Sequence, residues 1–134
     1  MHAFDTEFDE DIDEPDKLEP RYREQLADGS VTVLFGGDGP DGFVQLRYRP
    51  QVYSDAPAAY LEELYVVPER RGEGLGRALL EAALEKARAR GADHIELGTA
   101  ESDTAARALY ESAGFTNREG RPDGPVMLYY EREL

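Results

Sequence analysis

The hydrophobic pattern of the chain changes period along its length, and each change marks an expected element. Residues 30–35 form a short apolar run, and the side chains of residues 43–49 alternate between two faces. The glycine- and aspartate-rich residues 36–42 lie between them, so the pattern predicts a β-hairpin. Residues 58–67 are again rich in apolar and aromatic side chains and predict a third strand, which follows a loop at 50–57.

A helical period follows the third strand. Between residues 75 and 87, apolar side chains recur every three or four positions, and charged side chains fill the outer positions. Gly91 is a natural C-terminal cap for this helix. Residues 94–97 then predict a short strand, and Asp103–Ala113 predicts a second helix that ends at Gly114. A strand, a helix and a strand in this order imply a parallel pair in an otherwise antiparallel sheet.

The two ends of the chain have weaker patterns. Residues 15–28 show a broken helical pattern, which predicts a first helix. Residues 115–119 and 126–132 predict a last hairpin around a turn at 121–125. The expected fold class is therefore α/β (α+β), with a mixed, mostly antiparallel sheet and helices on both faces.

The composition is that of a soluble globular chain. Its 134 residues are 40% hydrophobic and 10% aromatic, which fits one domain with one core. No apolar run is long enough to span a membrane, and acids stand where a signal peptide has bases, so we expect a cytoplasmic protein. The lack of cysteine excludes disulfides and thiolate catalysis, and the two histidines show no metal-ligand spacing, so no metal is expected.

The charge of the chain is strongly negative and uneven. The net charge is −14, and residues 1–19 hold nine acidic residues against one lysine. This balance argues against binding nucleic acid through a general basic face. We expect residues 1–15 to form an acidic, partly disordered tail and residues 16–134 to form a single domain. The alternative is that the acidic segment attracts cationic substrates.

The segment Val66–Arg77 carries the most chemical information. A strand stops at Pro68, glycines follow at positions 72, 74 and 76, and a helix begins. Glycine lets backbone N–H groups approach a ligand closely, and a helix N-terminus adds unpaired donors with partial positive charge, so we expect an anion site. The segment lacks the lysine of a phosphate-binding P-loop and the glycine spacing of the dinucleotide fingerprint. The alternative is a tight turn that binds nothing.

Two stretches resemble one known family, the GNAT superfamily of N-acetyltransferases. The sequence RGEGLG at residues 71–76 is similar to the Arg/Gln-x-x-Gly-x-Gly/Ala motif of that family. The sequence ARALYESAGF at residues 106–115 resembles its AxxLYExxGF stretch. Both stretches fall within residues 58–116, nearly half of the chain, at the expected spacing.

The resemblance implies that the chain moves an acetyl group from acetyl-CoA directly to a primary amine of a small molecule or peptide. In that family the amides of the glycine loop hold the pyrophosphate. The strand before the loop pairs with the pantetheine arm, which requires that strand to separate from its next neighbour. Carried onto this chain, the cofactor-binding residues are Tyr65, Val66, Val67, Arg71, Gly72, Glu73, Gly74, Leu75, Gly76 and Arg77.

The resemblance also implies catalytic residues. Tyr110 stands at the tyrosine of the second stretch and is the expected acid for the leaving thiolate, with core packing as the alternative. Glu62 is the expected base, acting in several family members through water. Glu63 is the alternative: in a regular strand it points to the opposite face, and a bulge would exchange the two. The amide of Val66 is the expected donor to the oxyanion.

One position departs from the family pattern. Many relatives have asparagine at the start of the second helix, where this chain has Asp103. An ionised aspartate cannot donate a hydrogen bond to pantetheine, so we expect Asp103 to cap the helix, with Ser102 as the alternative cap.

The acceptor and the partners follow less directly from the sequence. The acidity of the chain favours a cationic amine, and residues 16–28 and 51–58 are expected to supply acceptor contacts. The alternative function is a non-catalytic CoA-binding sensor or partner-binding module of the same fold. We expect no membrane partner, and a homodimer because that is the commonest assembly.

Overall fold

The computed structural model describes residues 23–27, 29–37 and 39–134. They belong to two compact units, the first ending at Leu97 and the second spanning Gly98–Leu134. The expected acidic tail, residues 1–15, lies outside the described residues, so the division into a tail and one domain stays a prediction.

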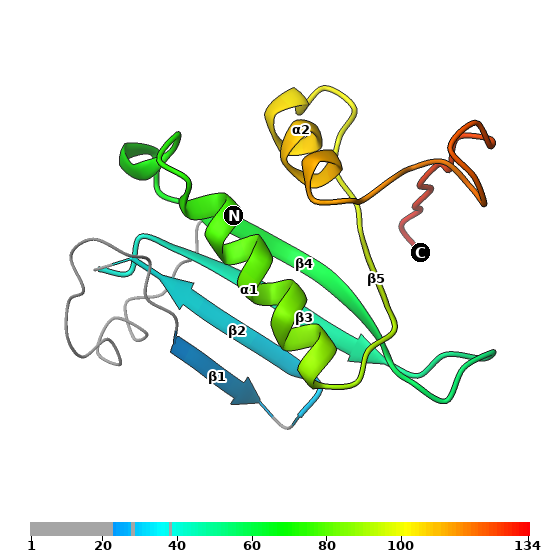
Figure 1. Ribbon diagram of the computed structural model, residues 1–134, viewed down its shortest axis with the longest axis horizontal. Helices are drawn as coiled ribbons and strands as arrows, with labels where there is room; N and C mark the ends of the chain where they lie inside the picture. The colour runs from blue at the N-terminus through cyan, green and yellow to red at the C-terminus, as the bar shows by residue number, and fades with distance from the viewer. Residues whose placement is uncertain (1–22, 28, 38) are drawn as a thin grey trace. The chain divides into compact units, whose positions relative to one another are not determined.

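The first unit is built on a five-stranded mixed sheet in which the strands lie in sequence order (Figure 1). The first four strands pair antiparallel with their neighbours, and the fourth and fifth pair in parallel. This confirms the predicted hairpin, the predicted third strand and the predicted parallel pair. The strands are β1 (Arg23–Ala27), β2 (Val31–Gly36), β3 (Gly42–Arg49), β4 (Ala58–Val66) and β5 (His94–Leu97).

The helix predicted over residues 15–28 is wrong where the structure describes that segment. Residues 23–27 form β1, which is paired antiparallel with β2. Gly29 lies in the turn between them with φ of 85°, in the left-handed region that favours glycine. Asp-Gly is a sequence typical of hairpin turns, and Asp28-Gly29 follows this segment in the chain. Backbone hydrogen bonds to β2 therefore stabilise a strand here more than the weak helical pattern stabilises a helix. The rest of the segment lies outside the described residues.

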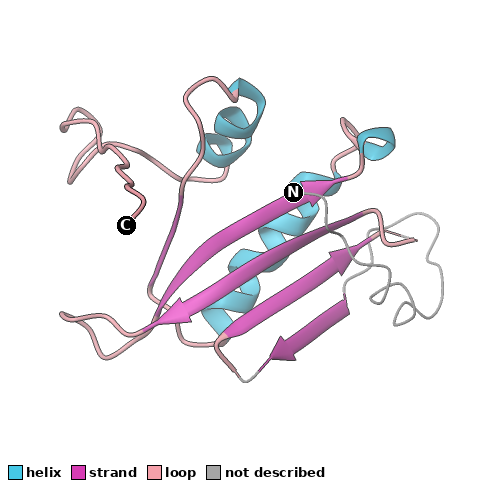
Figure 2. Ribbon diagram, turned by 180° about the vertical axis from the view of Figure 1, so that it is seen from behind, coloured by secondary structure: helices cyan, strands magenta, loops and turns pink. Residues whose placement is uncertain are grey.

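Helix α1 (Leu75–Ala89) lies across one face of the sheet (Figures 1 and 2). Its position depends on two strand glycines, because a Cβ at Gly36 or Gly42 would come within 3.0 Å of the Leu79 side chain. The predicted helix and its apolar stripe are confirmed. Its buried side chains are Leu75, Leu79, Leu80, Ala83 and Ala87.

The other face of the sheet carries aromatic and polar side chains. Because Gly42 faces α1, the alternation along β3 directs Phe43 and Gln45 to the opposite face. The ring of Phe43 lies 6.3 Å from that of Phe35 and 6.2 Å from that of Tyr65, between ring centres. Three aromatic rings therefore cover one end of this face, and the polar side chain of Gln45 lies next to them, further along β3.

The second unit contains α2 (Thr104–Ser112), which confirms the predicted second helix. The predicted hairpin of residues 115–119 and 126–132 is wrong in extent, because one isolated bridge joins Arg118 and Val126. The residues that follow form no strand, and Leu128 is 71% exposed. Two short strands that cover no hydrophobic face are marginal in water, which accounts for the short pairing. The expectation of helices on both faces of the sheet stays a prediction.

In the described part of the chain, neither α1 nor α2 combines the length and the apolar character that a membrane span requires.

Candidate functional site

Strand β4 is paired on both edges along only half of its length. β3 accompanies it as far as Val66, whereas β5 pairs only with Ala58–Leu61. From Glu62 to Val66, the edge away from β3 has no strand partner among the described residues, and β4 and β5 part there (Figure 1). This is the separation that the family resemblance implied.

The backbone at this open edge offers both a donor and an acceptor. The N–H of Val67 donates to the carbonyl of Asp41 at 2.8 Å, toward the side of β3. Because these directions alternate along a strand, the N–H and C=O groups of Val66 and Leu64 point to the open edge. The Val66 carbonyl accepts a hydrogen bond from Arg71 Nε there, at 2.8 Å. The edge can therefore pair with one further extended chain.

Glu62 is the extra residue of a β-bulge at the start of the open edge. Gln45 of β3 is paired with Glu63, and the next β3 residue, Leu46, is paired with Leu61, so Glu62 lies between two paired positions. Cross-strand partners share a face, which places Glu63 on the face of Gln45. Glu62 contacts Gln45 directly, so the bulge brings both glutamates to the face away from α1.

The carboxylate of Glu62 is held by two side chains of β3. Gln45 Nε2 donates to Oε1 at 2.6 Å, and Arg47 Nε donates to Oε2 at 2.8 Å. The hydrogen bond from Arg47 is the largest effect on the pKa of Glu62 and holds it below its ordinary value, against the opposing effect of partial burial. Glu62 is thus a fixed anion, able to orient a cationic amine or a water molecule and weak as a proton acceptor.

The glycine loop, residues 71–76, leads from β4 into α1. Gly72 and Gly74 have φ of 82° and 88°, and a Cβ at either position would meet nothing within 4 Å. α1 begins at Leu75 with no side-chain cap. None of the five N–H groups from Gly72 to Gly76 has a well-formed hydrogen bond to another residue in the described part of the chain. Consecutive free donors at a helix N-terminus are what an anion site requires.

Two arginines, Arg71 and Arg77, stand at the two ends of the glycine loop. The Arg71 guanidinium lies 5.6 Å from the centre of the Tyr65 ring. Arg77 Nη1 lies 3.4 Å from Oε2 of Glu81, four residues later on the same helix. Both side chains are exposed, and exposed pairs of this kind contribute little to stability.

Arg70 joins the loop to the turn between β2 and β3, a connection that the sequence analysis missed. It ends the short 3₁₀-helix η2 (Pro68–Arg70). Its Nη1 donates to Asp41 Oδ2 at 2.5 Å, and its Nε donates to Glu73 Oε1 at 2.8 Å. Asp41 lies 29 residues earlier in the chain. No periodic pattern relates a hairpin turn to a distant loop, so the sequence held no signal for this contact.

The predicted acid, Tyr110, lies on α2 in the second unit. Its ring makes an edge-on contact with Phe115, with ring centres 5.9 Å apart, and the side chain is half-buried. Asp103 Oδ1 accepts the N–H of Ala106 at 3.1 Å, which confirms the predicted N-terminal cap. Tyr110 belongs to the second unit and Glu62 to the first.

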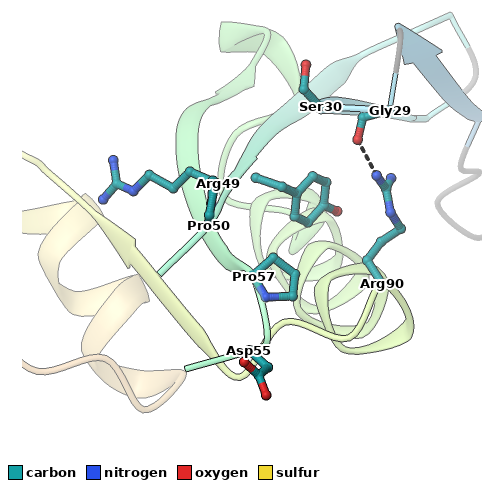
Figure 3. Close-up of a pocket in the computed structure, with 8 residues that line it drawn as sticks. Gly29, Ser30, Arg49, Pro50, Asp55, Pro57 and Arg90 are labelled. Atoms are coloured by element: carbon teal, nitrogen blue, oxygen red, sulfur yellow. Dashed lines mark hydrogen bonds between the residues drawn. The ribbon is translucent and has the colours of Figure 1, made fainter. Parts of the chain in front are cut away.

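A cavity of about 500 Å³ lies at the other end of the sheet from the glycine loop (Figure 3). Arg90, just after α1, crosses it: the guanidinium lies 4.4 Å from the centre of the Tyr48 ring and donates to the Gly29 carbonyl. Its lining residues are Gly29, Ser30, Tyr48, Arg49, Pro50, Asp55, Pro57 and Arg90.

The loop of residues 50–57 belongs to this far end, and the expectation that residues 51–58 contact the acceptor stays a prediction. β4 separates the loop from Val66, and at about 3.3 Å per residue its nine residues span on the order of 25 Å.

A comparison with known protein families shows which family this chain belongs to. The family described as "Acetyltransferase (GNAT) family" matches residues 1–115. The chain belongs to the GNAT family of acetyltransferases. The glycine loop and the start of α2 both lie within the matched residues, and the mixed sheet with its parallel pair fits the GNAT fold.

Individual GNAT relatives agree with this assignment. The chain is 38% identical to the mycothiol acetyltransferase of Beutenbergia cavernae over 102 residues, 74% of this chain and 33% of that protein. It is 40% identical to an aminoglycoside N(6')-acetyltransferase type 1 of Klebsiella aerogenes over 91 residues, 65% of this chain and 59% of that protein. A crystal structure from Arthrobacter sp. FB24, described as an acetyltransferase, is 47% identical with a TM-score of 0.71, covering 78% of this chain and 67% of that one.

The chain thus spans about one third of that mycothiol acetyltransferase and three fifths of that aminoglycoside acetyltransferase. These GNAT relatives are named for acetyl transfer, which does not favour the alternative of a CoA-binding module without turnover.

Proposed function

We propose that this GNAT chain moves the acetyl group of acetyl-CoA directly to a primary amine. One observation carries the proposal: the unpaired edge of β4 runs into five free N–H groups of the glycine loop. An extended arm with amide groups suits the edge, because it can replace a missing strand. A pyrophosphate suits the loop, because consecutive N–H groups at a helix N-terminus favour an anion. Pantetheine and pyrophosphate follow one another in acetyl-CoA.

The residues that would hold acetyl-CoA divide into two groups. Tyr65, Val66 and Val67 precede the loop, and the open-edge C=O group of Val66 would accept a hydrogen bond from the pantetheine arm. Pairing there requires Arg71 to leave the Val66 carbonyl, which frees its guanidinium for a phosphate. The loop group is Arg71, Gly72, Glu73, Gly74, Leu75, Gly76 and Arg77.

Acetyl-CoA supplies a thioester whose carbonyl a neutral amine can attack. A lysine-like amine has a pKa of about 10.4 and must lose a proton before it attacks. We assign Glu62 as the base acting through water: its carboxylate, ionised between Gln45 and Arg47, orients a water molecule that takes this proton and passes it to the solvent. The Val66 N–H points to the open edge and is assigned as donor to the oxygen that becomes negative.

Tyr110 is assigned as the acid that protonates the leaving thiolate. A phenol carries its proton at neutral pH, and a thiolate leaves more easily when it is protonated. The support for this role is the family motif at residues 106–115 together with the chemical type of the side chain.

The acceptor class is proposed to be a cationic amine. The aminoglycoside N(6')-acetyltransferases among the relatives act, by their names, on polycationic amines, and this chain is strongly acidic. Glu62 and Glu63 lie on one face and supply local negative charge. A cytoplasmic location, a homodimer, and a single domain over residues 16–134 complete the proposal, supported by composition and general frequency.

The experiment is an acetyl-transfer assay with a panel of amines. Acetyl-CoA is incubated with the protein and a polyamine, an aminoglycoside or a lysine-containing peptide, and released CoA thiol is measured. Mass spectrometry of the amine then identifies the acetylated product. Thiol release that depends on an amine and gives an acetylated amine supports the proposal. Binding of acetyl-CoA without turnover across the panel supports the non-catalytic alternative.

A further inference from the structure

Three charged side chains connect the turn before β3 to the glycine loop. We call Asp41, Arg70 and Glu73 the loop clamp. Arg70 is its centre, because one guanidinium group donates Nη1 to Asp41 and Nε to Glu73. The exposed fractions of the side chains are 21% for Asp41, 36% for Arg70 and 51% for Glu73, so the contacts run from the partly buried turn toward the solvent.

The Asp41 end of the loop clamp is firmly placed. The backbone N–H of Asp41 donates to the Gly36 carbonyl at 2.9 Å, and its carbonyl accepts the N–H of Val67 at 2.8 Å. Gly37 leaves the space that the carboxylate needs, because a Cβ there would lie 2.5 Å from Asp41 Oδ2. Arg70 is therefore anchored to the sheet at one end, and Glu73 is the movable end.

Glu73 poses a problem for an anion site. It stands in the middle of the glycine loop, between two glycines whose N–H groups are free donors. A carboxylate near a helix N-terminus is itself attracted to those donors and to the helix dipole. Released from Arg70, Glu73 would both repel a phosphate and compete with it for the same N–H groups.

We propose that Arg70 is a positioning residue for the cofactor site. Anchored by Asp41, it holds and neutralises the Glu73 carboxylate, so that the N–H groups of the glycine loop stay available to the phosphates of CoA. This rests on the proposed function only in that CoA must bind the loop. Exposed ion pairs add little to stability, so the main effect of the loop clamp is on phosphate binding.

The test compares CoA with pantetheine, which is the arm of CoA without its phosphates and adenosine. CoA carries the pyrophosphate, whereas pantetheine carries the arm without any phosphate. Dissociation constants are measured by calorimetry for the wild type, Arg70→Met, Glu73→Gln and the double variant Arg70→Met/Glu73→Gln. Arg88→Met is the matched control, because it removes the same charge from an exposed position in the last turn of α1.

We expect Arg70→Met to weaken CoA binding about fivefold and to leave pantetheine binding unchanged. The double variant regains wild-type affinity for CoA, because the competing carboxylate is gone, and Arg88→Met has no effect. Arg70→Lys, which keeps the charge, serves as the second variant if Arg70→Met does not fold.

Four results would overturn the inference. Equal weakening of CoA and pantetheine indicates a collapsed loop, and failure of Glu73→Gln to restore affinity indicates that the carboxylate is not the competitor. If the wild type binds CoA and Arg70→Met binds it equally well, the role of the loop clamp is refuted and the proposed function is not affected. Absence of CoA binding by the wild type removes the proposed function together with this inference.

Discussion

At Glu62, a one-residue bulge in β4 and two hydrogen bonds from β3 act on the same carboxylate. The bulge brings the side chain to the face away from α1, and Gln45 and Arg47 occupy both of its oxygens. A carboxylate held in this way is ionised at neutral pH and fixed in direction. These properties suit electrostatic orientation of an amine or water better than direct proton abstraction.

Replacing Arg47 tests this description of Glu62. Arg47→Met removes the hydrogen bond and the charge, so we expect the pKa of Glu62 to rise, as measured by NMR titration of its carboxyl carbon. The lowered pKa stabilises the wild type above the unfolded-state value, about 4.3, and this part is lost as the pH falls through the folded-state value. Arg47→Met should therefore lose stability at pH 7, and this loss should shrink as the pH falls through the folded-state pKa of Glu62. An unchanged pKa would contradict the pairing.

Replacing Gly74 tests the glycine loop. Its φ of 88° is costly for a residue with a Cβ, although no neighbour lies within 4 Å of that position. Gly74→Val should cost about 1–2 kcal/mol of stability and abolish acetyl-CoA binding, read by thermal unfolding with and without the ligand. Normal binding by Gly74→Val would refute the assignment of the loop.

Replacing Tyr110 separates chemistry from binding. Tyr110→Phe keeps the ring beside Phe115 and removes the proton, so turnover should fall at least tenfold while the acetyl-CoA dissociation constant stays within twofold. Tyr53→Phe is the matched control, because Tyr53 is 98% exposed in the loop after β3. Turnover that survives in Tyr110→Phe would remove Tyr110 from the acid role.

At the scale of elements, the patterns with strong local signals predicted the structure well. The hairpin of β2 and β3, the strand before the glycine loop, and both helices lie where hydrophobic period and glycines placed them. Each depends on contacts within a short window of sequence. The segment that became β1 depends on pairing with β2, and the Asp28-Gly29 turn sequence was the signal that could have revealed it.

The side chains of the site are placed by the register between β3 and β4, which could not be predicted from the sequence. Whether Glu62 or Glu63 turns toward Arg47 is decided by a one-residue bulge, and no local pattern marks it. The partner of Arg70, Asp41, lies 29 residues away across a turn. The motif therefore located the glycine loop, but the side chains that shape the site around it required the folded structure.

The packing of α1 on the sheet gives a prediction at this scale. Leu79 is fully buried and fills the space left by Gly36 and Gly42. Leu79→Ala should lower the free energy of unfolding by about 2–5 kcal/mol in denaturant titration. Leu128→Ala, at a position 71% exposed, is the control and should change it by less than about 0.5 kcal/mol. Equal effects of the two variants would contradict the assigned core.

At the scale of the whole molecule, global charge and local charge point in different directions. The chain carries a net charge of −14, yet its proposed cofactor is an anion. The two are compatible, because charges separated by more than about 8 Å are screened at physiological salt, whereas the loop N–H groups and Arg71 act at contact distance. By the same reasoning, carboxylates close to the open edge, such as Glu62 and Glu63, would attract the proposed cationic amine.

The most direct test of the account is thermal unfolding of the wild type with acetyl-CoA, with ATP and NAD as controls. Ligand at about 100 times its dissociation constant adds about 2.7 kcal/mol, which raises the midpoint by several degrees in a domain of this size. We expect such a rise with acetyl-CoA and none with ATP or NAD. No rise at saturating acetyl-CoA would leave the glycine loop without its ligand and contradict the account.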